Sequence, residues 1–238
     1  MPEHTRTCIA TLGGERVELY AERALNWPRG RTLFVADVHL GKAAAFRAGG
    51  VPLPRGITSD DLARLARLIA ATRAERLVVL GDFLHAAAGR TRALERAFVA
   101  WRAQHKALAL TLVRGNHDAR AGDPPAAWRI ETVAEPYPAP PFLLCHEPPA
   151  DRAGSGALLA QCAPYALAGH VHPGVRIDGK GLQSERLPCF VLGKQRAILP
   201  AFGRFTGLET RAWGRHDRVV AIAGERLLAL PPRYSSST

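Results

Sequence analysis

Five short polar motifs in this sequence contain the aspartate, asparagine and histidine residues that commonly bind divalent metal ions. In chain order they are Asp37-Val38-His39, Gly81-Asp82-Phe83-Leu84-His85, Gly115-Asn116-His117-Asp118, His146 within Leu144-Cys145-His146-Glu147, and Gly169-His170-Val171-His172. Two divalent cations about 3.5–4 Å apart need a bridging carboxylate, imidazole and neutral oxygen ligands, and a position left for a shared water. The motifs supply each ligand type, so the sequence predicts a two-metal site.

The candidate ligands combine oxygen and nitrogen donors without a thiolate: Asp37, His39, Asp82, Asn116, His146, His170 and His172. This mixture suits Mn²⁺, Fe, Co²⁺ or Zn²⁺. Two such ions lower the pKa of a shared water toward neutrality, which gives a hydroxide nucleophile without a protein base. Taken alone, each motif has a simpler interpretation as a turn or a core histidine. All five together, placed at expected strand ends, favour the metal site.

Buried strands and amphipathic helices must position these motifs. We expect strands at Thr32–Ala36, Leu77–Leu80 and Leu108–Val113, each ending just before a motif. We expect helices from Ser59 or Asp60 to Ala74 and over Thr91–Lys106, on the basis of helical spacing of apolar residues. This alternation predicts an α/β fold with parallel strands, whose carboxyl ends are where such sheets bind ligands.

The remaining sequence is mostly β-prone. A hairpin is expected over Thr7–Leu12, Gly13-Gly14 and Arg16–Tyr20. Later strands are expected at Phe142–Cys145, Tyr165–Ala168, Val175–Asp178, Pro188–Leu192, Phe205–Ala212, Val219–Ala223 and Arg226–Ala229, with Pro136–Pro141 as a surface loop. We therefore expect a second sheet packed on the first. Residues 1–238 form a single expected domain, with the catalytic motifs in 33–175, a β-rich part in 176–234 and a tail in 235–238.

Composition narrows the class of protein. The net charge of +11 favours a polyanionic partner, although arginine-rich composition alone does not establish nucleic acid binding. No run approaches the roughly 20 apolar residues of a membrane span, and the N-terminus lacks a secretory pattern. The cysteines Cys8, Cys145, Cys162 and Cys189 are scattered, which favours reduced thiols. We expect a cytoplasmic protein that does not associate with membranes.

With these motifs the sequence resembles the calcineurin-like metallophosphoesterase superfamily over roughly Leu33 to Val175. The resemblance implies an α/β four-layer metallophosphoesterase fold, a two-sheet β-sandwich flanked by helices. It also implies that Asp37, His39 and His172 bind the first metal, that Asp82 bridges, and that Asn116, His146 and His170 bind the second. His117 matches the superfamily's non-ligand catalytic histidine, which contacts the scissile phosphate or protonates the leaving oxygen.

Differences between these motifs and those of known phosphatases narrow the range of possible substrates. Protein Ser/Thr phosphatases carry Asp-Arg-Gly where this chain has His85-Ala86-Ala87, and Gly-Asn-His-Glu where this chain has Asp118. His85 instead resembles a histidine of DNA-repair nucleases in the superfamily that approaches the substrate phosphate. We therefore favour a catalytic role for His85; the alternative is a residue that only orients its neighbours.

A closer resemblance is to bacterial ligase-associated metallophosphoesterases. It rests on the segment from Phe34 to Lys42, on Phe46-Arg47, Gly49-Gly50 and Val51-Pro52-Leu53-Pro54, on Cys145-His146-Glu147-Pro148, and on Leu199 to Gly207. That family implies a manganese-dependent, single-strand DNA endonuclease of DNA repair, encoded with a DNA ligase, a helicase and an exonuclease. Leu208 replaces a glycine that is frequent in the family, which leaves the shape of that loop open.

Basic residues near the motifs predict contacts with backbone phosphates: Lys42, Arg47, Arg55, Arg114 and Arg120. The Gly- and Pro-punctuated stretch Lys42–Arg55 is expected to be a substrate-binding loop. Phe46, Phe83 and Trp128 are candidate stacking surfaces, although core packing is the commoner role of an aromatic residue.

Two rival functions stay open. One is a small-molecule phosphodiesterase or phosphomonoesterase that acts on a cyclic or dinucleotide substrate with the same metals. The other is a non-catalytic DNA-binding partner in a repair complex.

Overall fold

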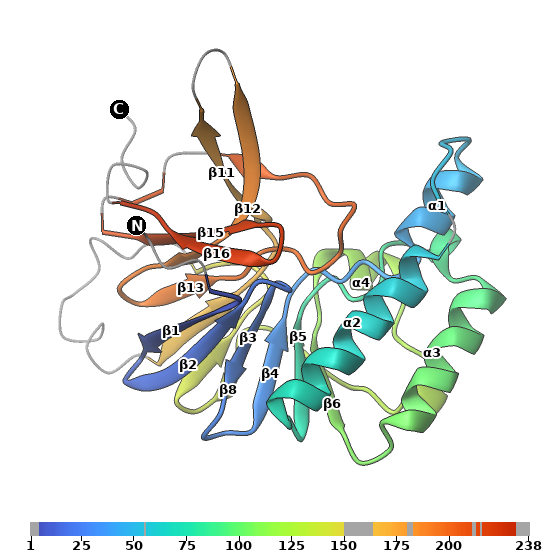
Figure 1. Ribbon diagram of the computed structural model, residues 1–238. Helices are drawn as coiled ribbons and strands as arrows, with labels where there is room; N and C mark the ends of the chain where they lie inside the picture. The colour runs from blue at the N-terminus through green and yellow to red at the C-terminus, as the bar shows by residue number, and fades with distance from the viewer. Residues whose placement is uncertain are drawn as a thin grey trace.

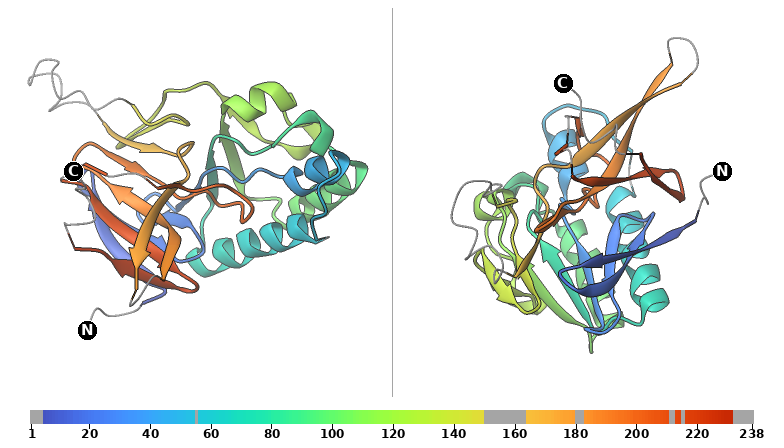
Figure 2. Two further views of the ribbon diagram at one scale, coloured as in Figure 1. Left: turned by 90° about the horizontal axis from the view of Figure 1, so that it is seen from above. Right: turned by 90° about the vertical axis from the view of Figure 1, so that its left-hand side faces the viewer.

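The computed structural model describes residues 5–54, 56–149, 164–179, 183–210, 213–214 and 216–231. Two sheets pack face to face, and helices cover the outer face of the first (Figures 1 and 2). The expected α/β two-sheet sandwich is therefore confirmed. Among the described residues, no helix is both long and apolar enough for a membrane span.

The first sheet has the strand order β1-β2-β3-β4-β5-β6-β7. Its strands are β1 (Thr7–Leu12), β2 (Glu15–Tyr20), β3 (Ala24–Trp27), β4 (Thr32–Val35), β5 (Arg76–Leu80), β6 (Ala109–Val113) and β7 (Glu131–Val133). Strands β1 to β4 pair antiparallel and β4 to β7 pair parallel. The expected parallel core and N-terminal hairpin are confirmed, whereas the short strands β3 and β7 were not predicted.

The second sheet runs β14-β11-β12-β13-β10-β9-β8, and β15 pairs with both β12 and β16. Its strands are β8 (Tyr137–Ala139), β9 (Phe142–Leu144), β10 (Tyr165–Ala168), β11 (Pro173–Asp178), β12 (Ser184–Leu192), β13 (Arg196–Ile198), β14 (Glu209–Thr210), β15 (Arg218–Ala223) and β16 (Arg226–Ala229). The predicted loop Pro136–Pro141 is wrong in part, because β8 lies within it and pairs with β9.

All helices of the described residues lie between Lys42 and Trp128. They are α1 (Lys42–Ala48), α2 (Ile57–Thr72), α3 (Arg92–Gln104) and α4 (Asn116–Ala121), with one-turn 3₁₀ helices η1 (Ala87–Gly89) and η2 (Ala126–Trp128). Helices α2 and α3 confirm the helical periodicity. The predicted cap of α2 is wrong, because the helix begins one turn earlier, after Gly56 in a left-handed conformation. Thr91 caps α3, its hydroxyl accepting from the Leu94 amide at 3.2 Å.

Two hydrophobic cores hold the layers together. One lies between the first sheet and its helices, and includes Leu65, Phe98 and Trp128. The other fills the space between the sheets, with Phe34 and Val78 of the first sheet facing side chains such as Phe190 of the second. Fully burying a large apolar side chain contributes roughly 1.5–3 kcal/mol. The cores thus fix the strand ends, where the polar motifs begin.

Two segments near the motifs differ from expectation. The stretch Lys42–Arg55, expected to be a loop, starts with α1, because three consecutive alanines favour a helix before Gly49-Gly50 ends it. The strand predicted at Phe205–Ala212 is wrong at its start: Arg204 and Phe205 form a turn, and β14 begins at Glu209 and includes Thr210. The last two positions of the prediction, 211 and 212, lie outside the described residues. Ala201, just before this turn, makes a parallel bridge to Ala36.

Candidate metal centre

The first two motifs follow the neighbouring parallel strands β4 and β5 and remain paired beyond the strand ends. The Asp37 amide donates to the Gly81 carbonyl at 3.1 Å, and the His39 amide donates to the Asp82 carbonyl at 2.8 Å. Beyond them, Leu40 and Leu84 form a parallel bridge. The two loops therefore present their carboxylate and imidazole side chains from one edge of the sheet.

The first cluster consists of Asp37, His39 and His172, whose ligand atoms all lie within 4.8 Å of one another. His172 Nε2 is 3.4 Å from Asp37 Oδ1 and 3.3 Å from His39 Nε2. Burial, with the charge of Lys42 next, lowers the pKa of His39 to about 2. Its imidazole is therefore neutral, which is the form that binds metals.

The second cluster consists of Asp82, His146 and His170, again within 4.8 Å of one another. His146 Nε2 lies 3.4 Å from Asp82 Oδ1 and 3.0 Å from His170 Nδ1. Asn116 lies beside this second cluster, since its Oδ1 is 3.0 Å from His146 Nε2. Two nitrogens, an amide oxygen and a carboxylate thus converge, which is a donor set suited to a divalent transition metal.

Asp82 lies between the two clusters. Its Oδ1 faces His146, and its Oδ2 is 3.9 Å from His39 Nε2 of the first cluster. Asp37 is fully buried and Asp82 is 2% exposed. Burial raises the pKa of Asp82, while His146 acts against this shift. Buried carboxylates need a compensating positive charge, so the chemistry of these residues fits two bound divalent cations.

Five of the seven candidate ligands have left-handed backbone conformations. The φ angles are 52° at Asp37, 51° at His39, 52° at Asp82, 67° at His170 and 50° at His172. Non-glycine residues in this region are uncommon and strained, and they gather at functional sites. The tight turns that follow from these angles place Asp37 and His39 in one cluster and divide His170 and His172 between the two.

Surrounding groups fix the orientation of His146. Its Nδ1 lies 3.1 Å from the Leu80 carbonyl oxygen. Because a carbonyl oxygen only accepts, Nδ1 carries the proton, and Nε2 presents its lone pair to the second cluster. Gly81 is necessary here: its φ is 77°, and an added Cβ would lie 2.0 Å from His146 Nδ1. Glu135 holds the same loop by accepting the amides of His146 and Glu147.

Asp118 joins the second and third motifs. Its carboxylate is fully buried and accepts the amides of Leu84 at 2.8 Å, Gly115 at 3.0 Å and Phe83 at 3.3 Å. Burial raises its pKa, and the amide donors oppose the shift. Asp118 therefore holds the loops that carry Asp82 and Asn116 at a fixed separation.

His85 and His117 stack beside the first cluster, with ring centroids 4.9 Å apart and an interplanar angle of 21°. His117 Nδ1 lies 2.8 Å from the backbone carbonyl oxygen of His85, so Nδ1 donates this hydrogen bond and Nε2 takes no part in it. That Nε2 is 4.0 Å from Asp82 Oδ2, and His85 Nδ1 is 3.4 Å from His39 Nδ1. Both histidines border the metal centre.

The five basic residues predicted to bind substrate have different surroundings. Lys42 is half-buried, 5.8 Å from the centre of the Phe46 ring, and its charge acts on Asp37 and Asp82. Arg47 donates to the Leu53 and Pro54 carbonyls, and Arg114 forms a two-bond ion pair with Asp123. Arg120 is exposed in the last turn of α4, and Arg55 lies outside the described residues. Of the four described basic residues, Lys42 is therefore the one whose contacts place it at the metal centre.

The sequence did not predict that Asp118 and Glu135 position the loops of the site. Both act through hydrogen bonds between segments that are far apart in the sequence. The sequence indicated Asp118 only as a departure from another family. A usable signal existed: an acid three residues after Gly115, at the start of α4, is a helix-capping pattern.

Comparison with known proteins agrees with this geometry. The family model for calcineurin-like phosphoesterases matches residues 30–154. The chain is similar to the crystal structure of Pseudomonas putida nuclease MPE, with 40% sequence identity, a TM-score of 0.78, and coverage of 94% of this chain and 100% of that one. No curated protein matches. The chain therefore belongs to the calcineurin-like phosphoesterase family and is a phosphoester hydrolase.

Proposed function

We propose that this protein is a two-metal, manganese-dependent endonuclease that cleaves single-stranded DNA. The observation that carries the proposal is the contact of both ligand clusters with one carboxylate, Asp82, directly beside the His85–His117 pair. The similarity to a solved nuclease at 40% identity supports nucleic acid as the substrate.

In this proposal, Asp37, His39 and His172 hold the first metal ion, and Asn116, His146 and His170 hold the second. Asp82 faces both clusters and is the shared ligand. When bound, the two ions polarise the phosphate and activate a shared water for attack. The chain's part is to hold the ligands in fixed positions, through the backbone bonds between the loops and through Asp118.

His117 is the proposed catalytic acid. Because its Nδ1 proton is engaged by the His85 carbonyl, Nε2 is the atom that can deliver a second proton to a departing oxygen. Its side chain is 31% exposed and therefore reachable by substrate. A positioned general acid typically contributes 10²–10⁴-fold to a rate.

His85 has a different proposed role. Burial, together with the charges of Lys42 and His117, lowers the pKa of His85 to about 4. Its imidazole is neutral near pH 7, so it acts as a hydrogen-bonding group toward the phosphate rather than as an acid. Bound metal cations would lower this pKa further, in the same direction.

Exposed aromatic residues favour a single-stranded substrate. Phe46 is 38% exposed and lies 5.9 Å from the His85 ring, while Phe205 is 43% exposed in the turn next to the first motif. Unpaired bases stack on such rings with little sequence preference. Lys42 beside Phe46 adds a positive charge for the backbone, and we keep Arg120 as a further candidate phosphate contact. Arg47 and Arg114 are weaker candidates because they already make hydrogen bonds or ion pairs within the chain. Arg55, outside the described residues, stays a candidate from the sequence alone.

Incubation with circular single-stranded DNA tests the proposal. The metal-free protein is loaded with Mn²⁺, Mg²⁺, Co²⁺ or Zn²⁺ in turn, and the products are separated on a gel. Linear product with Mn²⁺ is expected, and chelation should abolish it. Turnover of cyclic or dinucleotide phosphodiesters with no linear DNA would favour the small-molecule alternative. A metal-loaded protein that cleaves neither DNA nor bis(p-nitrophenyl) phosphate would favour the non-catalytic DNA-binding alternative.

The resemblance to ligase-associated enzymes also supports a cellular setting. We propose a single-domain cytoplasmic protein that acts in DNA repair with a DNA ligase, a helicase and an exonuclease. Sensitivity of a deletion strain to DNA-damaging agents, restored by the wild-type gene and not by a His117→Ala gene, tests this setting.

A further inference from the structure

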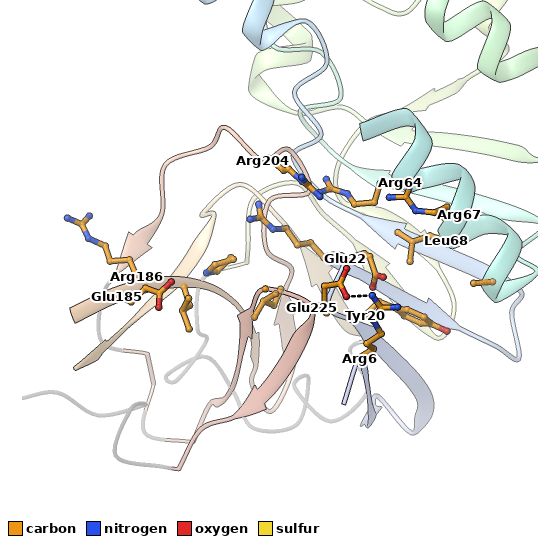
Figure 3. Close-up of a pocket in the computed structure, with 17 residues that line it drawn as sticks. Arg6, Tyr20, Glu22, Arg64, Arg67, Leu68, Glu185, Arg186, Arg204 and Glu225 are labelled. Carbon is orange, nitrogen blue, oxygen red and sulfur yellow. Dashed lines mark hydrogen bonds and ion pairs between the residues drawn. The ribbon is translucent and has the colours of Figure 1, made fainter. Parts of the chain in front are cut away.

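A cavity of about 830 Å³ opens outside the two ligand clusters. Its walls come from helix α2, the end of β2, strand β12 and the turn between β15 and β16. Figure 3 shows Arg64, Arg67 and Arg204 along one side, with Glu22, Glu225 and Tyr20 on the other. A volume of roughly 300–1,000 Å³ accepts a small organic ligand, so one or two nucleotide units would fit.

Positive charge is concentrated on one side of the cavity. The charges of Arg23, Arg204 and Arg67 all act on Arg64, and against them stands one carboxylate, Asp61, 3.0 Å from the Arg64 guanidinium. Burial and these three neighbouring charges lower the pKa of Arg64 to about 10, despite Asp61. Asp61 interacts with Arg64, Arg204 and Arg23 and offsets part of the mutual repulsion of the four guanidinium groups, and an anionic ligand would offset more of it.

Two of these arginines have structural partners. Arg23 donates to the carbonyls of Ala201 and Gly203 at 3.0 and 3.2 Å. Arg64 donates to the Phe202 carbonyl and lies over the Phe202 ring, 3.8 Å from its centre. Together they fix the segment 201–203.

Three of these arginines have donor groups without a partner among the described residues. Arg64 is 4% exposed, yet its Nε–H has no hydrogen-bond partner among the described residues. Arg67 and Arg204 are exposed and make no hydrogen bond or ion pair within the described part of the chain. The exposed guanidinium groups of Arg67 and Arg204 are therefore the ones that a ligand in the cavity can reach.

Arg204 relates this cavity to the metal centre. It lines the cavity and also a separate, much smaller pocket beside the first motif, together with His39, Lys42 and Phe205. The preceding residues pair directly with the first motif, since the Gly203 amide donates to the Asp37 carbonyl at 3.1 Å. A strand leaving the metal centre would therefore meet Phe205 and Arg204 first, and Arg67 beyond them.

We propose that this cavity binds backbone phosphates of the single-stranded DNA flanking the cleaved bond, with Arg204 and Arg67 as phosphate ligands and Phe205 as a stacking surface. The inference rests on the proposed nuclease function and extends it to a second contact region. Guanidinium groups bind phosphate oxygens in pairs, which suits arginine at this position.

Steady-state kinetics of Arg67→Ala, Arg204→Ala and the double variant test the inference. Both side chains are exposed, so the variants should fold. With a 20-nucleotide oligothymidylate, each single variant should raise KM about tenfold at unchanged kcat. The slope of log KM against log salt should fall by about 0.7 per arginine removed. With bis(p-nitrophenyl) phosphate, too small to reach the cavity, kcat/KM should stay within about twofold of wild type.

Arg96→Ala, an exposed arginine on α3 away from the cavity, is the matched control and should behave as wild type with both substrates. An oligonucleotide KM unchanged in the double variant overturns the inference and leaves the nuclease function standing. Equal losses on both substrates also overturn it, because they indicate damage to the metal centre. A wild-type protein that hydrolyses only the small diester overturns the nuclease function, and this inference with it.

Discussion

The His117 ring stacks on the His85 ring and donates its Nδ1 proton to the His85 backbone carbonyl, 2.8 Å away. This pair of contacts selects one tautomer of His117 and directs Nε2 toward the metal centre. Because the bond uses the backbone of His85, a side-chain substitution at residue 85 preserves it. The two histidines can therefore be separated experimentally.

His117→Ala should retain both metal ions and lose most turnover. His117 is not one of the seven proposed ligands, although its ring packs edge-on against His39 with centroids 4.9 Å apart, and it is the proposed proton donor. We expect kcat to fall about 10²–10⁴-fold, with metal content measured by mass spectrometry alongside the kinetics. A variant devoid of metal would show that His117 supports the clusters instead.

His85→Gln should reduce the acid sensitivity of the metal-free protein. The folded pKa of His85, about 4, lies below its ordinary value of 6.5. Between pH 4 and 6.5 the imidazole of residue 85 binds a proton in the unfolded chain but not in the folded protein. The free energy of unfolding therefore keeps the contribution of His85 above about pH 6.5 and loses it as the pH falls toward 4.

Urea denaturation in a chelator, at pH 7 and pH 5, measures this effect. The difference between the two midpoints should be smaller in His85→Gln than in wild type. The same substitution at the exposed His216 serves as the control and should leave the difference unchanged. Equal differences in all three proteins would contradict the prediction.

Asp118→Asn should destabilise the fold and weaken metal binding together. The carboxylate accepts three backbone amides from two motif loops. In asparagine one of the two oxygens becomes an NH₂ group, which would face a backbone N–H and could not accept its hydrogen bond. A loss of about 2–3 kcal/mol in the free energy of unfolding is expected. Asp123→Asn, which removes only an exposed ion pair with Arg114, should cost less than about 1 kcal/mol. Similar losses in the two variants would argue against the role of Asp118.

Gly81→Ala should disrupt the second cluster. Its Cβ would overlap His146 Nδ1, in addition to the cost of a left-handed backbone for alanine. Gly14→Ala has a similar φ of 82° with nothing within 4 Å of the added Cβ, so it isolates the backbone cost of about 1 kcal/mol. Only Gly81→Ala should lower the bound metal from two equivalents to one. Two equivalents in both variants would show that His146 can move without losing the ion.

The sequence predicted which aspartate and histidine side chains the fold brings together, because this information is local. Each motif directly follows an apolar run, and such a run becomes a buried strand whose end position is fixed, as at Leu80 before Gly81-Asp82. The groups that hold the motifs together act over long sequence distances. Arg23, Arg64 and Asp118 each reach segments that no periodicity connects to them.

Local signals were also misleading in two places. Gly49-Gly50 and the following prolines suggested a loop, yet the alanines before them form α1. The apolar and β-branched residues after Arg204 suggested a strand, but Arg23 and Arg64 hold residues 201–203 against the first motif, and the chain turns immediately afterwards.

The left-handed backbone conformations of five proposed ligands also oppose the stability of the fold to its catalytic activity. These residues are Asp37, His39, Asp82, His170 and His172. Glycine adopts these angles without a steric penalty, so replacing any of the three histidines by glycine would relieve backbone strain while removing a ligand. Asp37 and Asp82 differ, because each also accepts a backbone amide that glycine would leave without its acceptor. Selection for heat resistance alone would drift toward such inactive sequences. A screen for robust variants of this enzyme must therefore select for turnover at every round.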